Sequence, residues 1–259
     1  MNLVLIVSPD HSLQAAKYGL TLAHLAYGLG GGELYLTVGN LGLQTRGGYL
    51  GLCDDVLPQV GDPDQLAAQV LAECRRRRFC GVLADFEREP GERTLAILGA
   101  LERALGAAGL DLLVPEAYGG ALPRAQVLIC SAISGGKLTD YLAGRAEAYP
   151  GRAVLELRRL RMAFPLPCPA AEGEPIGAEA LQAVLDACPA YYSESLGCNY
   201  VTSREGEEVK FILYDTPGTL RRKLALAEEL GYSRAVMLYP EAVDFLETMD
   251  QPGTGTKAR

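Results

Sequence analysis

The chain is poor in the residues on which metal and redox sites depend. Its 259 residues contain no tryptophan and only two histidines, His11 and His24, which excludes a histidine-rich metal centre. The seven cysteines are widely spaced and include no C-x-x-C pair. An odd number of cysteines in a chain too long to need disulfide cross-links is typical of free thiols in a reducing compartment. We therefore expect neither a metal nor a cofactor.

Long apolar runs and clustered positive charge are also missing. No run approaches the ~20 apolar residues that span a bilayer, and the first apolar segment, residues 3–7, is short and has no basic flank. These features predict a cytoplasmic protein with no membrane partner. The net charge of −8 argues against binding to nucleic acid, which requires clustered Lys and Arg. The one basic run, residues 75–78, follows an apolar helix pattern and complements that helix's dipole. The oligomeric state stays open.

Strand and helix patterns alternate along the chain, which predicts a parallel sheet covered by helices. The expected strands are residues 3–8, 33–38, 81–86, 111–115, 126–132, 153–157 with an extension to 164, 210–214 and 235–239. The expected helices are residues 12–28, 63–77, 92–108, 136–147, 177–187 and 217–230. Eight strands in a chain of this size favour a single (β/α)₈ TIM barrel over residues 1–250, followed by a disordered tail, 251–259.

One region departs from this alternation. Residues 188–215 lack a clean helix pattern, and we expect an irregular or antiparallel excursion there. If residues 210–214 belong to that excursion, one barrel strand must instead come from residues 21–29 or 49–53.

The heptapeptide from Gly81 to Glu87, GVLADFE, is the most informative segment. On a strand, Asp85 and Glu87 share one face with Leu83, because side chains alternate sides with period two. The other face is fully apolar. Parallel α/β folds carry their chemistry at the carboxyl ends of strands, which is where these two acids occur.

This segment resembles the catalytic strand of family 18 glycoside hydrolases, which include chitinase-like and spore-germination enzymes and share the pattern D-x-x-D-x-D-x-E. Glu87 matches the final Glu and Asp85 the third Asp, while Cys80 and Leu83 occupy the first two Asp positions. The resemblance implies that Glu87 is the general acid on the glycosidic oxygen. It also implies that Asp85 orients the substrate's own N-acetyl group, which acts as the nucleophile.

A second resemblance lies near the C-terminus. Tyr214 and Asp215 end a strand, a helix follows, and the last apolar strand ends at Tyr239. This order is similar to the family's last helix and strand, where a Trp forms the floor of the sugar site. The resemblance implies that these three residues contact substrate, with Tyr239 in place of the Trp.

Other strand ends offer further candidates. Glu116 and Tyr118 follow the next expected strand, where Glu116 either faces the barrel mouth or is a solvated loop acid. Met162 lies on the unusually charged strand that follows residue 153, and we include it with Glu116 and Tyr118 among the substrate-binding candidates. Arg158 and Arg159 on that strand mark a chain leaving the sheet or, alternatively, contact the acids or a ligand carboxylate.

The sequence also departs from the family pattern. The family's M-x-Y-D strand places its Tyr and Asp on Ala132 and Ile133, so both polar groups are lost. The leading hypothesis is substrate-assisted hydrolysis of a β-linked amino-sugar glycan, with an amino-sugar oligomer as ligand. The alternative is a barrel that keeps the cleft and has lost turnover, acting as a carbohydrate-binding or scaffold protein. A third possibility is another barrel chemistry that uses Glu87 and Glu116.

Overall fold

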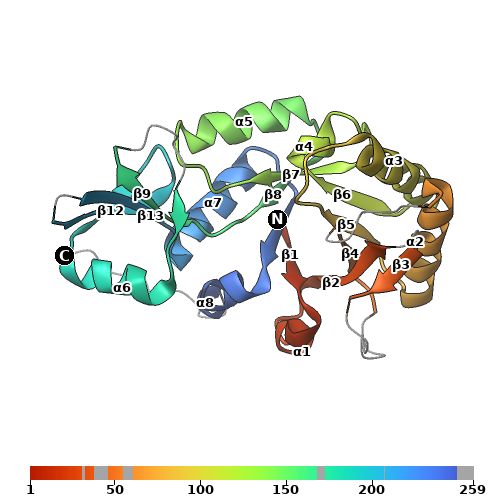
Figure 1. Cartoon of the computed structure of the whole chain (residues 1–259), viewed down its shortest axis with the longest axis horizontal. Helices are drawn as coiled ribbons and strands as arrows, with labels where there is room; N and C mark the ends of the chain where they lie inside the picture. The colour runs from red at the N-terminus through yellow and green to blue at the C-terminus, as the bar shows by residue number, and fades with distance from the viewer. Residues whose placement is uncertain (31–32, 38–45, 55–60, 168–172, 207, 250–259) are drawn as a thin grey trace. The chain divides into compact units, whose positions relative to one another are not determined.

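The structure is a computed structural model that describes residues 1–249 except 31–32, 38–45, 55–60, 168–172 and 207. The tail predicted for residues 251–259 lies outside the described residues. The chain forms two compact units (Figure 1). Unit 1 comprises Met1–Ile129, Arg145–Glu156 and Gly231–Tyr239, and unit 2 comprises Cys130–Gly144, Leu157–Leu230 and Pro240–Arg259.

Unit 1 is built on a closed parallel barrel of eight strands. In spatial order these are β1 (Asn2–Val7), β14 (Arg234–Leu238), β8 (Ala153–Glu156), β7 (Gln126–Cys130), β6 (Asp111–Pro115), β5 (Gly81–Asp85), β4 (Tyr49–Cys53) and β2 (Thr21–Gly30). The pairing of β1 with β2 closes the ring. A ninth strand, β3 (Glu33–Leu36), pairs antiparallel with β2. The predicted (β/α)₈ barrel is therefore confirmed.

The barrel interior is filled by one buried side chain from each of the eight strands. These residues are Val4, Ala23, Tyr49, Leu83, Leu113, Leu128, Val154 and Val236. The opposite face of β5 presents Val82 and Ala84 to a separate buried cluster. That cluster includes apolar side chains of the helices α2 (Pro63–Arg77) and α3 (Glu92–Ala107). The alternation read from the heptapeptide thus assigns the two faces of β5 correctly.

Local sequence explains where the helix α2 begins and ends. The Asp62 carboxylate accepts a hydrogen bond from the Asp64 backbone N–H at 2.9 Å, and Pro63 occupies the first helical position. The helix ends at Arg78, whose φ of 60° lies in the left-handed region that glycine usually occupies. The remaining helices are η1 (Pro9–His11), α1 (Ser12–Ala16), α4 (Glu116–Gly119), α5 (Leu138–Ala148), α6 (Ala178–Ala187), α7 (Pro217–Glu229) and α8 (Tyr239–Met249).

The first third of the chain corrects three expectations. The helix expected over residues 12–28 is wrong, because only α1 is helical there and β2 is a barrel strand buried along most of its length. A continuous apolar run fits a buried strand and a buried helix equally well. The segment 33–38 forms β3, which lies outside the parallel ring. Both segments named as reserve strands, 21–29 and 49–53, enter the barrel.

Unit 2 contains a five-stranded antiparallel sheet. Its order is β10 (Glu174–Pro175), β9 (Arg161–Leu166), β13 (Glu208–Tyr214), β12 (Cys198–Glu205) and β11 (Ala190–Ser193). This sheet confirms the antiparallel excursion near residues 188–215 and removes residues 210–214 from the barrel. The predicted extension to residue 164 is a separate strand, because residues 157–160 leave β8 before β9 begins. Arg158 and Arg159 therefore mark a chain that leaves the sheet, as the favoured interpretation expected.

None of the described helices combines the length and the apolar character that a membrane crossing requires.

Candidate functional site

Asp85 is the last residue of β5 and is partly buried. It shares a face of the strand with Leu83, which belongs to the cluster inside the barrel. Asp85 therefore lies at the C-terminal end of β5, on the face of the strand that lines the barrel.

Glu87 lies two residues beyond β5, and its side chain is exposed. Its backbone is nevertheless fixed by a carboxylate from the neighbouring strand. Asp54, directly after β4 and only 3 % exposed, accepts hydrogen bonds from the backbone N–H groups of Glu87 and Arg88, both at 3.2 Å. The segment that carries the candidate acid thus has a defined backbone position.

Sequence reasoning missed Asp54. The only available signal was its place directly after an apolar strand, at the same barrel edge as Asp85.

Tyr118 supports the same segment from within unit 1. It is fully buried, its ring packs edge-on against Phe86 with centroids 6.0 Å apart, and its hydroxyl donates to the Arg88 carbonyl at 2.7 Å. Burial raises the pKa of the Tyr118 hydroxyl. The ring therefore stabilises the turn after β5, and contact with a ligand would require that packing to open.

Glu116 begins α4, directly after β6, and its carboxylate lies 2.7 Å from the Arg145 guanidinium. Its side chain retains 27 % exposure. The ion pair compensates the charge of Glu116, which makes it less available as a second catalytic acid beside Glu87.

Tyr239 follows the last barrel strand and begins α8. It is 7 % exposed, and its ring lies in an aromatic group with His11 and Tyr18, at centroid distances of 5.7 and 6.2 Å. An aromatic residue therefore stands at the end of the last strand, as expected, with most of its surface covered by its neighbours.

The candidates in unit 2 divide into core and cavity residues. Tyr214 is buried in an apolar cluster with Leu181, Val201 and Ile212, so it belongs to the core of the unit. Met162 lines a cavity of about 480 Å³ whose lining residues all come from unit 2.

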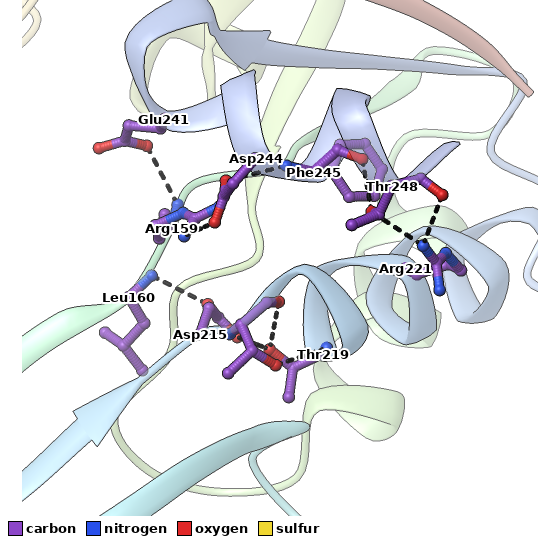
Figure 2. A network of polar contacts seen from close by, with 10 residues as sticks. Arg159, Leu160, Asp215, Thr219, Arg221, Glu241, Asp244, Phe245 and Thr248 are labelled. Atoms are coloured by element: carbon purple, nitrogen blue, oxygen red, sulfur yellow. Dashed lines mark hydrogen bonds and ion pairs between the residues drawn. The ribbon is translucent and has the colours of Figure 1, made fainter. Parts of the chain in front are cut away.

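Asp215 is the centre of a buried polar network. Its carboxylate accepts hydrogen bonds from the Leu160 backbone N–H at 2.9 Å and from Thr219 Oγ1 at 2.8 Å (Figure 2). It also accepts one from Lys223 Nζ at 2.7 Å. The Asp215 and Lys223 side chains are 0 % and 1 % exposed. These contacts leave the Asp215 carboxylate little acceptor capacity for a sugar. In this structure Asp215 connects the Leu160 backbone with two side chains of α7, those of Thr219 and Lys223.

The positions of the lost Tyr–Asp pair have apolar surroundings. Ala132 and Ile133 are partly buried and pack against an apolar cluster that includes Leu160, Phe164 and Leu213. The described residues contain no group of three or more His, Cys, Asp and Glu side chains arranged to hold a metal ion.

Comparison with known proteins places the fold. No family model and no curated protein matches the chain in sequence. Among solved structures, it is similar to a chitinase from Chromobacterium violaceum, with a TM-score of 0.66, 15% identity and coverage of 97% of this chain and 99% of that one. It is also similar to a family 18 N-acetylglucosaminidase from Paenibacillus barengoltzii, with a TM-score of 0.67, 12% identity and coverage of 95% and 98%.

A third similar structure is a family 18 chitinase from the plant Cycas revoluta, solved as a mutant in complex with (GlcNAc)₄. Its TM-score is 0.65, its identity is 11%, and 96% of this chain and 98% of that chain are covered. At these identities the likeness defines the fold. The chain has the barrel seen in family 18 glycoside hydrolases, which confirms the resemblance noted in the sequence at the level of architecture.

Proposed function

We propose that this protein is a glycoside hydrolase that cleaves a β-linked amino-sugar glycan by substrate assistance. The observation that carries the proposal is the position of Asp85 and Glu87 at the C-terminal end of β5, with Asp85 on the face that lines the barrel. Active sites of such barrels lie at this end of the strands. The fold shared with chitinases and an N-acetylglucosaminidase supports an amino sugar as substrate.

In this proposal, Glu87 donates a proton to the glycosidic oxygen as the bond to the anomeric carbon breaks. The carbonyl oxygen of the substrate's N-acetyl group attacks that carbon and forms a cyclic intermediate. Asp85 accepts a hydrogen bond from the N-acetyl N–H and orients the group for attack. Water then attacks the anomeric carbon, which opens the ring of the cyclic intermediate, and gives a proton to Glu87. This step restores the protonated acid. The hydrogen bonds from the turn after β5 to Asp54 hold the Glu87 backbone in place throughout.

The test compares neighbouring carboxylates in one loop. Glu87→Gln should remove nearly all turnover of an N-acetylglucosamine oligomer while leaving its binding measurable, because only the proton is lost. Asp85→Asn should slow turnover less completely, since its role is orientation. Glu89→Gln is the matched control, because Glu89 is equally exposed two residues further along. Turnover that survives Glu87→Gln unchanged would assign the acid elsewhere.

One alternative has its own supporting observations. A barrel that binds amino-sugar glycans without turnover fits the exposure of Glu87, since the general acid of an enzyme usually lies in a site that excludes water. It also fits the apolar packing of Ala132 and Ile133 at the positions of the lost Tyr–Asp pair. Micromolar binding of an N-acetylglucosamine oligomer together with no hydrolysis by the unmodified protein would favour this alternative.

A further inference from the structure

The end of α2 concentrates positive charge in a protein whose net charge is −8, because four arginines follow one another there. Arg76 and Arg77 share one counter-charge: both guanidinium groups donate to the Glu73 carboxylate, at distances from 2.6 to 2.8 Å. Arg75 and Arg78 are exposed, and neither forms an ion pair with any residue that the structure describes. Two charges of the run are therefore available at the surface.

The segment before β4 brings a third exposed arginine to the same place. The Gly47 N–H donates to the Arg77 carbonyl at 3.0 Å, which sets Arg46 beside the end of α2. The Gly48 carbonyl accepts from the Cys80 N–H at 2.7 Å, so the segments that precede β4 and β5 lie together. Arg46 likewise has no ion pair among the described residues. We call the three exposed arginines without a counter-charge, Arg46, Arg75 and Arg78, the basic patch.

The backbone of Arg78 indicates that its side chain is not there for stability. With a φ of 60°, it is the one non-glycine residue at positive φ in the part of the chain that the structure describes. The helices α3 and α7 are followed by glycines in this conformation, Gly109 and Gly231. A side chain in the left-handed region costs more than a cation at a helix C-terminus returns, and the last turn of α2 already contains three arginines. Stability alone would therefore favour glycine at position 78.

The surroundings of the basic patch favour one kind of anionic partner. Duplex nucleic acid, with a charge every ~1.7 Å, would bring many phosphates against an acidic protein. Single strands are bound by exposed aromatic rings, but the rings beside the patch, Tyr49 and Phe79, are each 3 % exposed. An acidic polysaccharide separates its carboxylates by neutral sugars, so a few of them can meet three arginines. The planar guanidinium fork matches the two oxygens of a carboxylate.

We propose that the basic patch binds the carboxylate groups of an acidic polysaccharide. Arg78 lies before the first residue of β5, whereas Asp85 is its last residue. The basic patch therefore lies at the amino-terminal end of the barrel strands, opposite the candidate acids. It holds the polymer by charge at one end of the barrel and leaves the other end open. The inference goes beyond the proposed hydrolysis, because it requires binding at a second site and no turnover by Glu87.

Calorimetric titration with two forms of one polymer tests the charge requirement. Hyaluronan fragments carry a carboxylate on every second sugar, and reduction of these carboxylates to alcohols gives a neutral polymer of the same length. The acidic form should bind about tenfold or more tightly than the reduced form, and added salt should reduce the difference. Equal binding of the two forms, binding of neither, or tighter binding of a DNA strand than of the acidic form would overturn the proposal.

Substitution of the arginines locates the binding. The triple variant Arg46→Gln, Arg75→Gln, Arg78→Gln should weaken binding of the acidic polymer about tenfold or more, as the combined loss of three exposed charge contacts. Arg103→Gln is the matched control, because it removes an exposed arginine of α3 that is paired with Asp64, and it should bind like the parent. A triple variant that binds the acidic polymer as the parent does would place the site elsewhere and overturn the proposal.

Arg78→Gly separates a binding role from a structural one. Glycine adopts the left-handed conformation without the steric cost, so the variant should raise the melting temperature by about 2–4 °C. It should also weaken binding of the acidic polymer about two- to fivefold, since one guanidinium is lost. A variant that is more stable and binds less well supports the proposal. A variant that is less stable and binds as the parent does would assign Arg78 to folding and overturn it.

Discussion

The inside of the barrel and the interior of unit 2 are both closely packed, but only unit 2 includes a buried ion pair in its interior. Inside the barrel, one buried side chain from each of the eight strands joins an apolar cluster that contains no charged residue. Unit 2 instead buries a complete ion pair, Asp215 with Lys223, beside its apolar clusters. In the barrel the acids stand at the strand ends, where Asp85 and Glu87 are accessible. In unit 2 the acid is used internally, to fix the backbone of a neighbouring segment.

This difference shows what each region requires from its charges. A buried ion pair contributes little net stability compared with apolar residues of similar volume, because desolvation offsets the attraction. Its value here lies in geometry, because the Asp215 carboxylate fixes the position of the Leu160 backbone N–H. In unit 1 the strand ladders fix the strands themselves, and a single buried carboxylate, Asp54, fixes the backbone of the turn after β5.

The largest expected effect follows from breaking the buried pair. Asp215→Ala leaves the Lys223 ammonium buried without its partner and should reduce the free energy of unfolding by about 3–5 kcal/mol, measured by urea denaturation. The double variant Asp215→Leu, Lys223→Met removes both charges and should recover most of the loss. A loss below about 1 kcal/mol for the single variant would show that the pair is not held as tightly as its geometry indicates.

In unit 1, the buried His24 of β2 should make the stability of the protein depend on pH. Burial, and secondarily the nearby positive charge of Arg77, lowers the pKa of His24 from 6.5 to about 4. Between pH 6.5 and 4 the unfolded chain therefore binds a proton at His24 that the folded chain does not. The free energy of unfolding has the full contribution of neutral His24 above pH 6.5 and loses it as the pH falls toward 4. The expected loss is at most about 3 kcal/mol. In His24→Gln this slope should vanish from unfolding curves recorded across that window, and an identical slope in both proteins would refute the assignment.

A smaller effect is expected at the barrel's C-terminal edge. Asp54→Ala removes the acceptor of the Glu87 and Arg88 N–H groups and should cost about 1–3 kcal/mol of unfolding free energy. If the protein is a hydrolase, the variant should also lower kcat more than it raises KM, because the acid is displaced while the sugar contacts remain. Asp62→Ala, which removes the capping carboxylate of α2, is a control that affects stability alone. Equal kcat values in the Asp54→Ala and Asp62→Ala variants would show that Asp54 does not position the catalytic acid.

The smallest effect concerns Tyr239. Tyr239→Phe keeps the ring contacts with His11 and Tyr18 and should change stability by no more than about 0.5 kcal/mol. If the ring stacks on a sugar, Tyr239→Ala should weaken glycan binding about tenfold while Tyr239→Phe has little effect. Loss of stability in Tyr239→Ala without any change in binding would make Tyr239 a core residue only.

Much of the fold could be predicted because its signals are local. Alternation within the heptapeptide assigned both faces of β5, and Asp62 with Pro63 marked the start of α2. The missing helix pattern indicated the antiparallel sheet. The expected helix over residues 12–28 failed because β2 is apolar on both faces, a pattern that local sequence does not distinguish from a buried helix.

The site was less predictable, because its contacts join distant residues. Asp54 reaches Glu87 across 33 positions, and Asp215 reaches Leu160 across 55. The burial of Tyr118 and Tyr214 likewise depends on residues far along the chain. Strand periodicity could suggest which face a side chain takes, but not which backbone group it would meet there.

The closure of the barrel has a consequence for the protein's synthesis. Asn2 of β1 pairs with Arg234 of β14, 232 positions later (234 minus 2). At roughly 5–20 residues per second, the ribosome completes that partner about 10–50 s after β1 emerges. Through that interval one edge of β1, with its aliphatic run from Leu3 to Val7, has no strand to pair with. Such an edge is a template for pairing with another chain, so β1 is exposed to aggregation until β14 has been made.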